Sequence, residues 1–455
     1  MNSLKLLIDL YLLKHNAQKP EEQVKKLQDK KLRKLLKYTC EHSEYYHRAF
    51  AQAGITKKRI GNTPLSAFPS IDKATFLESF DELVTVPSLK QEELRQFDQQ
   101  ETTKQKNFMG RFHVVHSSGS TEKPSYFVYD ESAWEQMLIA VVRAAFWDMT
   151  VPQIFKLLTK GLRVAYIAAT DGRYGGAMAV GDGIRGVHAR QLFLDINMPL
   201  AQWVEQIRTF RPNFIIGYPS AIKILGGLVE KGEVQITPLR VVTCGEPLDT
   251  GLRCYFESVF FAKVINFYGA SESLALGVEV DPDDGIILFD DMNVIEVENG
   301  RMYLTSLYNY AQPLIRYRLS DQLKFKKRTE KSSCSFTRAL NLLGRDEDIL
   351  WFQNCGKREF LHPLAIEGFC LDGMVDYQFL QVGDDAFEML AEVPREEHRQ
   401  YVRAEMEKLM GNILLEKCLD YVKFSVHFVD SITPDPQTGK KRLVVKNTEK
   451  ARETK

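Results

Sequence analysis

The chain has 455 residues, more than one hydrophobic core usually supports, so two unequal domains are expected. Lysine plus arginine and aspartate plus glutamate both number 60, and the resulting zero formal charge excludes a global attraction to nucleic acid or an anionic membrane. The seven scattered cysteines contain no C-x-x-C motif, which argues against a disulfide framework or a zinc ribbon and favours a cytoplasmic location. A small, locally recognised substrate is the expected partner.

The first 100 residues are predicted to form a helical lead-in. Asp9 interrupts the short apolar run at residues 6–13, and no small-residue cleavage site follows, so this run predicts the start of an amphipathic helix. Apolar residues at helical spacing and dense lysines over residues 21–60 predict one or two solvated helices. No stretch approaches the roughly 20 apolar residues that a bilayer span requires, so no transmembrane segment is expected.

From about residue 112, short β-rich runs alternate with helical segments. The runs read FHVV, LRVAYIAA, NFIIGY, LRVVTC and KVINFYG. The helices are predicted to begin near Asp130, Pro199, Pro219 and Asp249. This alternation is typical of βαβ units, in which a parallel sheet carries helices on its faces. The Asn299-Gly300 pair then predicts a tight hairpin, so an antiparallel section follows the parallel one.

The remaining residues, 344–455, are predicted to form a small α+β domain. They contain a hairpin-like stretch that begins at Asp376, a charged helix over about residues 395–410, and the strand YVKFSVHFV. Residues 1–343 are predicted to form one large α/β domain, with parallel and mixed sheets flanked by helices.

The segment SSGSTEKP, residues 117–124, directly follows the strand-like FHVV. Four hydroxyls, a glycine and a lysine are typical of an anion-binding loop, because N–H groups and hydroxyls donate to phosphate oxygens while lysine supplies charge. The segment is not a Walker loop, since G-x-x-x-x-G-K-[ST] is absent. A polar surface loop is the alternative interpretation.

The motif YGASE, residues 268–272, also directly follows a strand-like run, where α/β sheets place ligand-binding loops. An aromatic ring can stack on a base, glycine lets the backbone approach, a hydroxyl can donate to phosphate, and a carboxylate can hold Mg²⁺. A hydrolase nucleophile elbow does not fit, because Ser273 stands where G-x-S-x-G requires glycine. An ordinary strand-to-helix turn is the alternative.

Three further motifs offer charged side chains. Asp321 ends the motif YRLSD after a strand-like run, where a carboxylate can accept both ribose hydroxyls. Arg345 lies in GRDED, at the point where the pattern of predicted helices and strands changes. This motif is therefore a candidate hinge or nucleotide contact. Lys440 lies in TGKKR, a turn-rich loop that can carry a catalytic lysine to a phosphate. The alternatives are an exposed salt bridge, an acidic turn and a solvated basic turn, respectively.

Two other motifs are interpreted as turns. Residues 181–186 match G-x-G-x-x-G, but no clean strand precedes them and no regular helix follows, which argues against a dinucleotide fingerprint. The motif DPDDG at residues 281–285 lacks the spacing and the closing glutamate of an EF-hand loop.

In this order, the motifs resemble those of the adenylate-forming superfamily. The resemblance is to the branch that contains phenylacetate-CoA ligase, capsule-cluster proteins and the synthetases that adenylylate a deazaflavin coenzyme. It spans nearly the whole chain, through KLRKLLKYTCEHSEYYHRAFAQAGI, SSGSTEKP, FIIGYPSAI, CGEPL, FYGASES, TSLYNYAQPLIRYRLSD, GRDED and QTGKKR. It implies a large N-terminal adenylate-forming domain and a small mobile C-terminal lid.

The resemblance also implies a role for each motif residue. The phosphate loop would surround the ATP phosphates, CGEPL would border the adenine, Tyr268 would stack on it and Asp321 would bind the ribose. The implied nucleotide-binding residues are Ser117, Ser118, Ser120, Thr121, Lys123, Gly245, Glu246, Pro247, Tyr268, Gly269, Asp321 and Arg345.

The implied catalytic residues are Ser271, Glu272 and Lys440. Ser271 would contact the α-phosphate, and Glu272 would bind Mg²⁺. Lys440 would stabilise charge as a carboxylate attacks the α-phosphorus, and Glu347 would be the hinge. No structural zinc is expected, because no cysteine cluster follows FYGASES.

The implied reaction is ATP-dependent adenylation of a carboxylic acid with pyrophosphate release, followed by acyl transfer to CoA. ATP and Mg²⁺ are the expected cofactors, and CoA or another small acceptor is the expected second partner. The resemblance to the family also implies a homodimer. Tyr126, Tyr218 and Phe267 are candidates to line the acid pocket, with core packing as the alternative.

Two departures from the family pattern keep other functions open. Glu122 stands where the family usually has glycine, which puts a carboxylate beside phosphates. Residues 349–363 replace a glycine-containing segment that is expected to help admit the second nucleophile. The alternatives are transfer of AMP or the activated acyl group to a non-CoA acceptor, such as a cofactor or saccharide, and a non-catalytic nucleotide-binding homologue.

Overall fold

The structure is a computed structural model of the chain. It describes residues 3–99, 107–116, 125–168, 170, 175–185, 189–196, 198, 200–298, 300–327, 334–342, 350–354, 357–361, 366, 369, 371–416, 419–432 and 442–446. Buried apolar residues form two clusters, one from Leu10 to Ala339 and the other from Leu350 to Val444. The predicted domain boundary between residues 343 and 344 lies outside the described residues and stays a prediction.

Helices occupy most of the first 100 residues. They are α1 (Ser3–Gln18), α2 (Glu21–His42), α3 (Glu44–Gln52), the 3-10 turn η1 (Leu65–Ala67), α4 (Lys73–Glu78), α5 (Phe80–Leu83) and α6 (Gln91–Asp98). The sequence terminates and restarts them with polar caps: Ser43 accepts a hydrogen bond from the backbone N–H of Tyr46, and Asp72 accepts one from that of Thr75. The helices predicted within residues 21–60 are therefore present.

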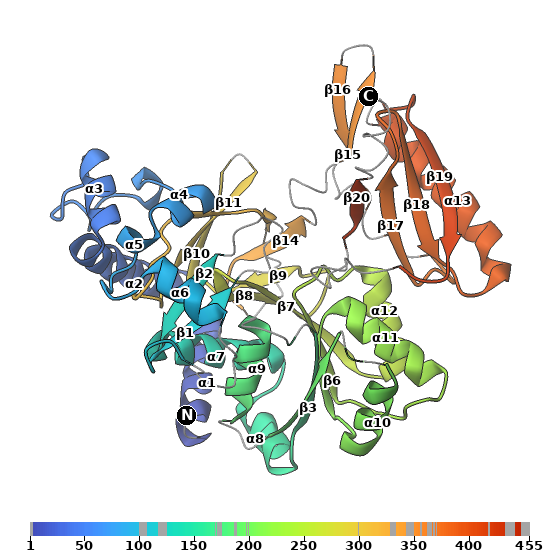
Figure 1. The fold of residues 1–455 in the computed structure, drawn as a ribbon, viewed down its shortest axis with the longest axis horizontal. Coiled ribbons are helices and arrows are strands. Elements are labelled where there is room, and N and C mark those ends of the chain that lie inside the picture. The colour runs from blue at the N-terminus through green and yellow to red at the C-terminus, as the bar shows by residue number, and fades with distance from the viewer. Residues whose placement is uncertain are drawn as a thin grey trace.

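A nine-stranded mixed sheet forms the centre of the large unit, in the order β13-β14-β9-β8-β7-β6-β5-β3-β4 (Figure 1). Its parallel part contains β3 (Arg163–Ala168), β4 (Arg190–Asp195), β5 (Phe214–Gly217), β6 (Arg240–Cys244) and β7 (Lys263–Ala270). Its antiparallel part contains β8 (Ser273–Glu279), β9 (Ile286–Leu288), β13 (Gln322–Lys326) and β14 (Arg338–Leu342). A separate antiparallel sheet contains β10 (Asn293–Glu298), β11 (Arg301–Ser306) and β12 (Tyr317–Leu319).

The helices around this sheet are α7 (Glu131–Ala145), α8 (Val151–Thr159), α9 (Gly175–Arg185), α10 (Leu200–Phe210), α11 (Pro219–Glu230) and α12 (Thr250–Phe260). Asp130 caps α7 and Asp249 caps α12, each through a 2.8 Å hydrogen bond from a backbone N–H, and Pro219 opens α11 at a position that needs no N–H donor. The predicted α/β fold, with parallel and mixed sheets flanked by helices, is confirmed.

Two local expectations and one alternative interpretation were wrong. The run FHVV forms β1 (Phe112–His116), which pairs antiparallel with β2 (Tyr126–Asp130) in a two-stranded sheet of its own, because the nine intervening residues are too few for a parallel crossover. Residues 181–185 lie in α9 and not in a turn, and Asp182 accepts a hydrogen bond from the Trp134 indole. The motif YGASE leads into a β-hairpin, since the apolar SLALGVE that follows pairs back onto β7 as β8.

The other predicted turns are present. Residues 282–284 form a turn, and β10 and β11 are joined at Gly300, whose φ of 75° suits glycine. Among the described residues, no helix is both long enough and apolar enough to cross a membrane.

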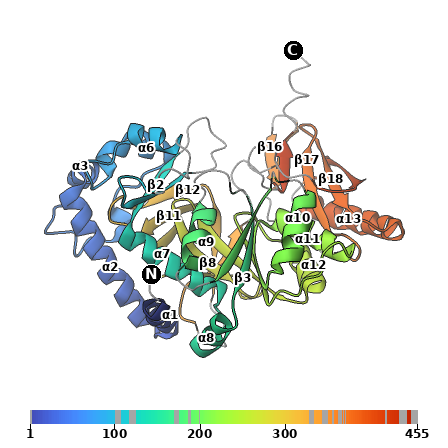
Figure 2. The ribbon, with the colours of Figure 1, turned by 60° about the horizontal axis from the view of Figure 1, so that its bottom comes forward.

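The C-terminal unit is an α+β layer with strand order β19-β18-β17-β20 (Figure 1). It contains β17 (Asp376–Gln381), β18 (Ala386–Glu392), α13 (Glu396–Glu416), β19 (Lys423–Val429) and β20 (Val444–Lys446), preceded by the hairpin of β15 (Leu350–Asn354) and β16 (Lys357–Leu361). The predicted hairpin, helix and strand are confirmed, although the helix continues six residues further than expected, to Glu416. Figures 1 and 2 show α11 and α12 beside β17 and β18, while α2 and α3 lie at the far end of the molecule.

Candidate nucleotide site

The motif YGASE forms the end of β7 and the tight turn into β8. Ala270 pairs with Ser273, and the strand register shifts between Tyr268 and Ala270. A Cβ on Gly269 would lie 2.5 Å from the carbonyl oxygen of Leu274, so a residue with a side chain would push the two strands apart. This irregularity re-aims the residues around it, as β-bulges commonly do next to functional sites.

Tyr268 and Asp321 are joined directly. The Tyr268 hydroxyl donates to Asp321 Oδ2 over 2.9 Å, although the two residues come from β7 and from the junction of β12 and β13. Burial, and next the charge of Asp321, hold the pKa of Tyr268 well above its usual value, so the phenol stays protonated and keeps donating. The structure therefore unites the predicted adenine-stacking and ribose-binding residues in one hydrogen-bonded pair.

Glu272 lies in the turn, among tyrosines. Burial raises the pKa values of Tyr129, Tyr268 and Tyr317, and the charge of Glu272 raises each of them further. Tyr129 also donates to the backbone carbonyl of Ser271 over 3.0 Å, which fixes the turn against β2. No group of three or more histidine, cysteine or acidic side chains suited to a metal occurs in the described part of the chain.

The predicted adenine-border residues follow β6, next to β7 in the sheet. Cys244 and Phe267 are register partners, so Gly245 and Tyr268 continue adjacent strands at the same carboxyl edge. Gly245 has a φ of 78°, and a Cβ there would lie 2.8 Å from Cε1 of Tyr218. The position therefore suits glycine for both its backbone conformation and its packing.

Glu246 is held by the first turn of α11. Its carboxylate accepts hydrogen bonds from the backbone N–H and the hydroxyl of Ser220, over 2.9 and 2.8 Å, and only 8 % of the residue is exposed. A carboxylate at a helix N-terminus satisfies donors that have no partner within the helix and interacts favourably with the helix dipole. This contact fixes the CGEPL loop, in which Pro247 is exposed, to α11.

The structure brings together the predicted residues of three motifs: Gly245, Glu246, Pro247, Tyr268, Gly269, Ser271, Glu272 and Asp321. The other predicted residues lie outside the described residues: Ser117, Ser118, Ser120, Thr121, Glu122, Lys123, Arg345, Glu347 and Lys440. Their positions, and the functional roles of all the motif residues, stay predictions.

Three residues that support the site were not singled out from the sequence. Tyr317 and Ser220 lie inside the motifs YRLSD and GYPSAI, where other positions drew attention. Tyr129 lies in the buried strand β2 and carried no signal, because its contact with the turn depends on a pairing between distant segments. Of the aromatic candidates for an acid pocket, Tyr218 packs against Gly245, while Tyr126 is buried in β2.

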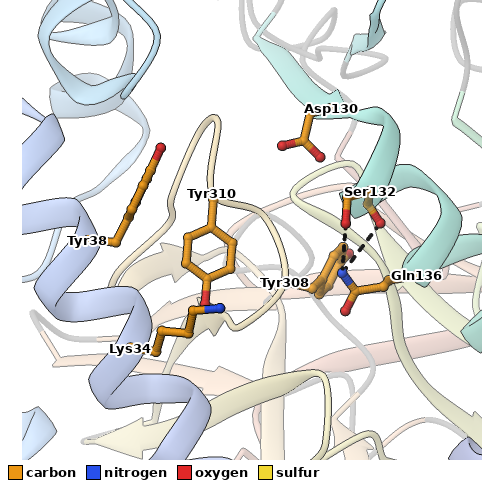
Figure 3. A pocket seen from close by; sticks show the side chains of 7 residues that line it. All are labelled: Lys34, Tyr38, Asp130, Ser132, Gln136, Tyr308 and Tyr310. Atoms are coloured by element: carbon orange, nitrogen blue, oxygen red, sulfur yellow. Dashed lines mark hydrogen bonds between the residues drawn. The ribbon is translucent and has the colours of Figure 1, made fainter.

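A separate cavity of about 300 Å³ lies between α2 and the start of α7 (Figure 3). Its lining residues are Lys34, Tyr38, Asp130, Ser132, Gln136, Tyr308 and Tyr310. The Lys34 ammonium is 5.6 Å from the centre of the Tyr310 ring, and the hydroxyls of Tyr308 and Ser273 are 2.9 Å apart. The cavity therefore adjoins the β7–β8 turn through Tyr308, but it is not lined by any predicted nucleotide-binding residue that the structure describes.

The chain is similar to known proteins in both sequence and fold. No protein-family model matches the chain. The chain is 26 % identical over 378 residues to the phenylacetate-coenzyme A ligase of Thermus thermophilus, a match that covers 77 % of this chain and 76 % of that protein. A shorter match, 30 % identical over 142 residues, covers 30 % of this chain and 36 % of the indoleacetate–lysine synthetase of Pseudomonas savastanoi.

Among solved structures, a 2-hydroxyisobutyryl-CoA ligase in its postadenylation state matches with a TM-score of 0.69, at 18 % identity, over 96 % of this chain and 92 % of that one. The same ligase in its thioesterification state matches over the same shares with a TM-score of 0.56. The fold and the sequence relatives together are those of the adenylate-forming superfamily. Within it, the chain is similar to the branch typified by phenylacetate-CoA ligases, at 24–26 % sequence identity.

Proposed function

We propose that the protein is an ATP-dependent ligase that adenylates a carboxylic acid and then transfers the acyl group to CoA. The observation that carries this proposal is the hydrogen-bonded pair of Tyr268 and Asp321 beside the turn that holds Glu272. An aromatic ring for a base, a carboxylate for ribose hydroxyls and a carboxylate for a metal are thus grouped around the β7–β8 turn. The phenylacetate-CoA ligase relatives, and a fold neighbour whose structures contain 2-HIB-AMP and CoA, support it.

In the first half-reaction, the Tyr268 ring stacks on adenine. Asp321 accepts a hydrogen bond from the Tyr268 hydroxyl and further hydrogen bonds from the ribose hydroxyls. A carboxylate oxygen of the acid attacks the α-phosphorus, the bond from phosphorus to the pyrophosphate oxygen breaks, and a mixed anhydride with AMP forms. The negative charge that develops on the phosphates would be stabilised by Ser117, Ser118, Ser120, Thr121, Lys123, Ser271 and Lys440.

Mg²⁺ is the metal that this site would hold. The donor set fits, because Mg²⁺ is commonly bound by one or two carboxylates together with substrate phosphates and waters, and Glu272 supplies a carboxylate. The bound ion would neutralise charge on the transferred and leaving phosphates.

In the second half-reaction, the CoA thiolate attacks the acyl carbon and AMP leaves, so that a thioester replaces the anhydride. We place the hinge at Glu347, between a large domain of residues 1–343 and a mobile lid of residues 344–455. The better match to the ligase in its postadenylation state than to its thioesterification state supports an arrangement of the two units that belongs with adenylation. A homodimer and a cytoplasmic location stay predictions.

Exchange of labelled pyrophosphate into ATP, measured with a panel of aryl and aliphatic carboxylic acids, tests the first half-reaction. We expect exchange that depends on one class of acid and that Lys440→Ala abolishes, while Lys441→Ala next to it retains activity. Mass spectrometry after addition of CoA then identifies the thioester. Normal ATP binding without exchange for any acid would contradict the proposal and favour a non-catalytic nucleotide-binding protein.

Transfer to an acceptor other than CoA is the second candidate. The partial match to an indoleacetate–lysine synthetase favours it, as does the β15–β16 hairpin, which lies where the family usually has a glycine-containing segment. AMP release that depends on an amine, cofactor or saccharide, with no thioester in the presence of CoA, would support this candidate.

A further inference from the structure

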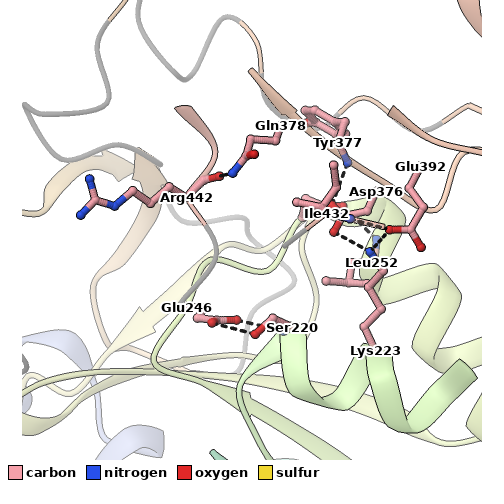
Figure 4. A network of polar contacts seen from close by, with 11 residues as sticks. Ser220, Lys223, Glu246, Leu252, Asp376, Tyr377, Gln378, Glu392, Ile432 and Arg442 are labelled. Carbon is pink, nitrogen blue, oxygen red and sulfur yellow. Dashed lines mark hydrogen bonds and ion pairs between the residues drawn. The ribbon is translucent and has the colours of Figure 1, made fainter. Parts of the chain in front are cut away.

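Lys223, in the second turn of α11, forms an ion bridge between the two units (Figure 4). Its ammonium nitrogen is 2.9 Å from Asp376 Oδ2 and 2.5 Å from Glu392 Oε2. The side chains of Lys223 and Glu392 are each 12 % exposed and that of Asp376 is 3 % exposed, so this bridge is largely shielded from water and salt. Such shielding separates it from the exposed ion pairs that contribute little to stability.

The two carboxylates are an unfavourable pair without a cation. Asp376 on β17 and Glu392 on β18 are direct register partners, which places like charges opposite each other across an antiparallel ladder. Burial increases the cost, because a charge with little access to water must be compensated by its neighbours. Lys223 supplies that compensation from the large unit, so the β17–β18 hairpin is electrostatically most favourable when it lies against α11.

The same hairpin holds both ends of the segment that carries Lys440. Glu392 Oε2 also accepts a hydrogen bond from the backbone N–H of Ile432 over 3.1 Å, and the Gln378 side chain donates to the carbonyl of Arg442 over 2.9 Å (Figure 4). These two contacts lie on either side of residues 433–441. Glu392 therefore connects Lys223 to the start of this segment through one carboxylate.

α11 also connects to the nucleotide motifs. Ser220, three residues before Lys223, holds Glu246 of the predicted adenine-border loop through two hydrogen bonds. Residues three apart on a helix lie on the same face, one turn apart. The first two turns of α11 thus contact both the adenine-border loop and the hairpin that holds the lysine segment.

We propose that Lys223 is a positioning residue for adenylation: by bridging Asp376 and Glu392 it places the Lys440 segment relative to the nucleotide site, and the bridge opens before acyl transfer. This inference rests on the proposed function. The proposed function already includes a lid movement. The inference names the contact that selects the adenylation arrangement of the two units.

The test separates the two half-reactions. Lys223→Met should lower acid-dependent pyrophosphate exchange about tenfold or more through kcat, with the KM for ATP changed less than about twofold, since each tenfold change in rate corresponds to about 1.4 kcal/mol. Thioester formation from pre-synthesised acyl adenylate and CoA should be unchanged or faster. Lys223→Arg should retain exchange, and Lys231→Met, at the exposed residue directly after the same helix, is the matched control.

A charge relocation provides a second, independent arm. Lys223→Glu alone places three carboxylates together, whereas Lys223→Glu combined with Asp376→Lys restores one cation between two anions. We expect the single variant to lose exchange and the double variant to regain a substantial part of it. Circular dichroism and melting temperature establish that each variant is folded.

Three outcomes would overturn the inference: Lys223→Met with normal exchange, an equal loss in both half-reactions, or no recovery in the folded double variant. If the unaltered protein lacks both half-reactions, it is the proposed function that fails. Small-angle scattering of the unaltered protein and Lys223→Met still decides the structural part in that case. Identical scattering profiles would show that the bridge does not set the arrangement of the two units.

Discussion

Tyr268 and Asp321, 53 residues apart in the chain, share a hydrogen bond of 2.9 Å between the tyrosine hydroxyl and a carboxylate oxygen. Asp321→Asn removes the charge from this pair and weakens any hydrogen bond to ribose. Hydrogen bonds to charged groups contribute about 1.5–3 kcal/mol, so we expect the KM for ATP to rise by roughly 10- to 150-fold. Steady-state kinetics of pyrophosphate exchange measure this change.

Tyr268→Phe is the matched variant, because it keeps the ring and removes only the donor. It should raise the KM for ATP less than Asp321→Asn does, by about fivefold for a net contribution near 1 kcal/mol. An effect larger than that of Asp321→Asn would show that the hydroxyl, and not the aspartate, contacts the nucleotide.

Glu272→Gln should make adenylation depend on a much higher Mg²⁺ concentration. The amide keeps the size of the side chain but loses the charge that a hard divalent cation prefers. We expect the Mg²⁺ concentration for half-maximal exchange to rise at least tenfold, with little change in melting temperature. Asp283→Asn, in the exposed turn after β8, provides the control, and equal Mg²⁺ profiles for both variants would argue against a metal role for Glu272.

Gly245→Ala should destabilise the protein more than Gly232→Ala. Both glycines have positive φ, of 78° and 72°, so both substitutions carry a backbone cost of about 1–2 kcal/mol. A Cβ at Gly245 meets Tyr218 at 2.8 Å, whereas a Cβ at Gly232 meets nothing within 4 Å. Urea titration gives the free energy of unfolding of each variant, and the difference between the two isolates the cost of displacing Tyr218. Equal values would mean that Tyr218 moves aside without a measurable cost.

Arg143→Met should cost about 3–5 kcal/mol of unfolding free energy, because it leaves the carboxylate of Asp291 buried without its charge partner. Both side chains are fully buried, and the guanidinium donates two hydrogen bonds to the carboxylate over 2.9 and 3.0 Å. Lys25→Met, which breaks an exposed pair with Glu21, should cost less than about 0.5 kcal/mol. Chemical denaturation compares the two, and a small effect of Arg143→Met would show that the site readily admits water.

Asp290→Asn should remove a pH dependence of stability between about pH 4 and 6. Burial raises the pKa of Asp290 to about 6 from its usual 3.8, so the folded protein binds the proton more tightly than the unfolded chain. This contribution to stability is complete below pH 3.8 and is lost as the pH rises through 6. One pKa unit corresponds to about 1.4 kcal/mol, and partial exposure reduces the effect to about 1–2 kcal/mol. Unfolding at pH 4, 5 and 7 checks the sign, and a decrease in stability toward pH 4 that requires Asp290 would contradict it.

Features fixed by neighbouring residues were predictable from the sequence. The starts of α7, α11 and α12 follow from Asp130, Pro219 and Asp249, because capping and proline act within one turn of the chain. The grouping of Tyr268, Glu272 and Asp321 was implied by the resemblance to the adenylate-forming superfamily and not by local pattern, since Asp321 follows β12 of the separate three-stranded sheet.

Features fixed by distant pairing were not predictable in the same way. The sequence of β1 is β-rich, but nothing local states that it pairs with β2 and not with the central sheet. The glycines at residues 181 and 183 indicate a turn, yet the segment is helical, and Asp182 within it accepts a hydrogen bond from the distant Trp134 indole. Tyr129 reaches the β7–β8 turn, and Lys223 reaches Glu392, only through the tertiary fold.

The buried carboxylate of Asp291 also ties the beginning of the chain to its later part. Asn16 and Arg143 both donate to this carboxylate, and the backbone N–H of Ser335 donates to the carbonyl of Ala17. During synthesis, α1 therefore leaves the ribosome about 300 residues before all of its partners exist. Contacts this distant in sequence fold slowly, so the first helix must remain exposed or be protected by a chaperone until the large unit is nearly complete.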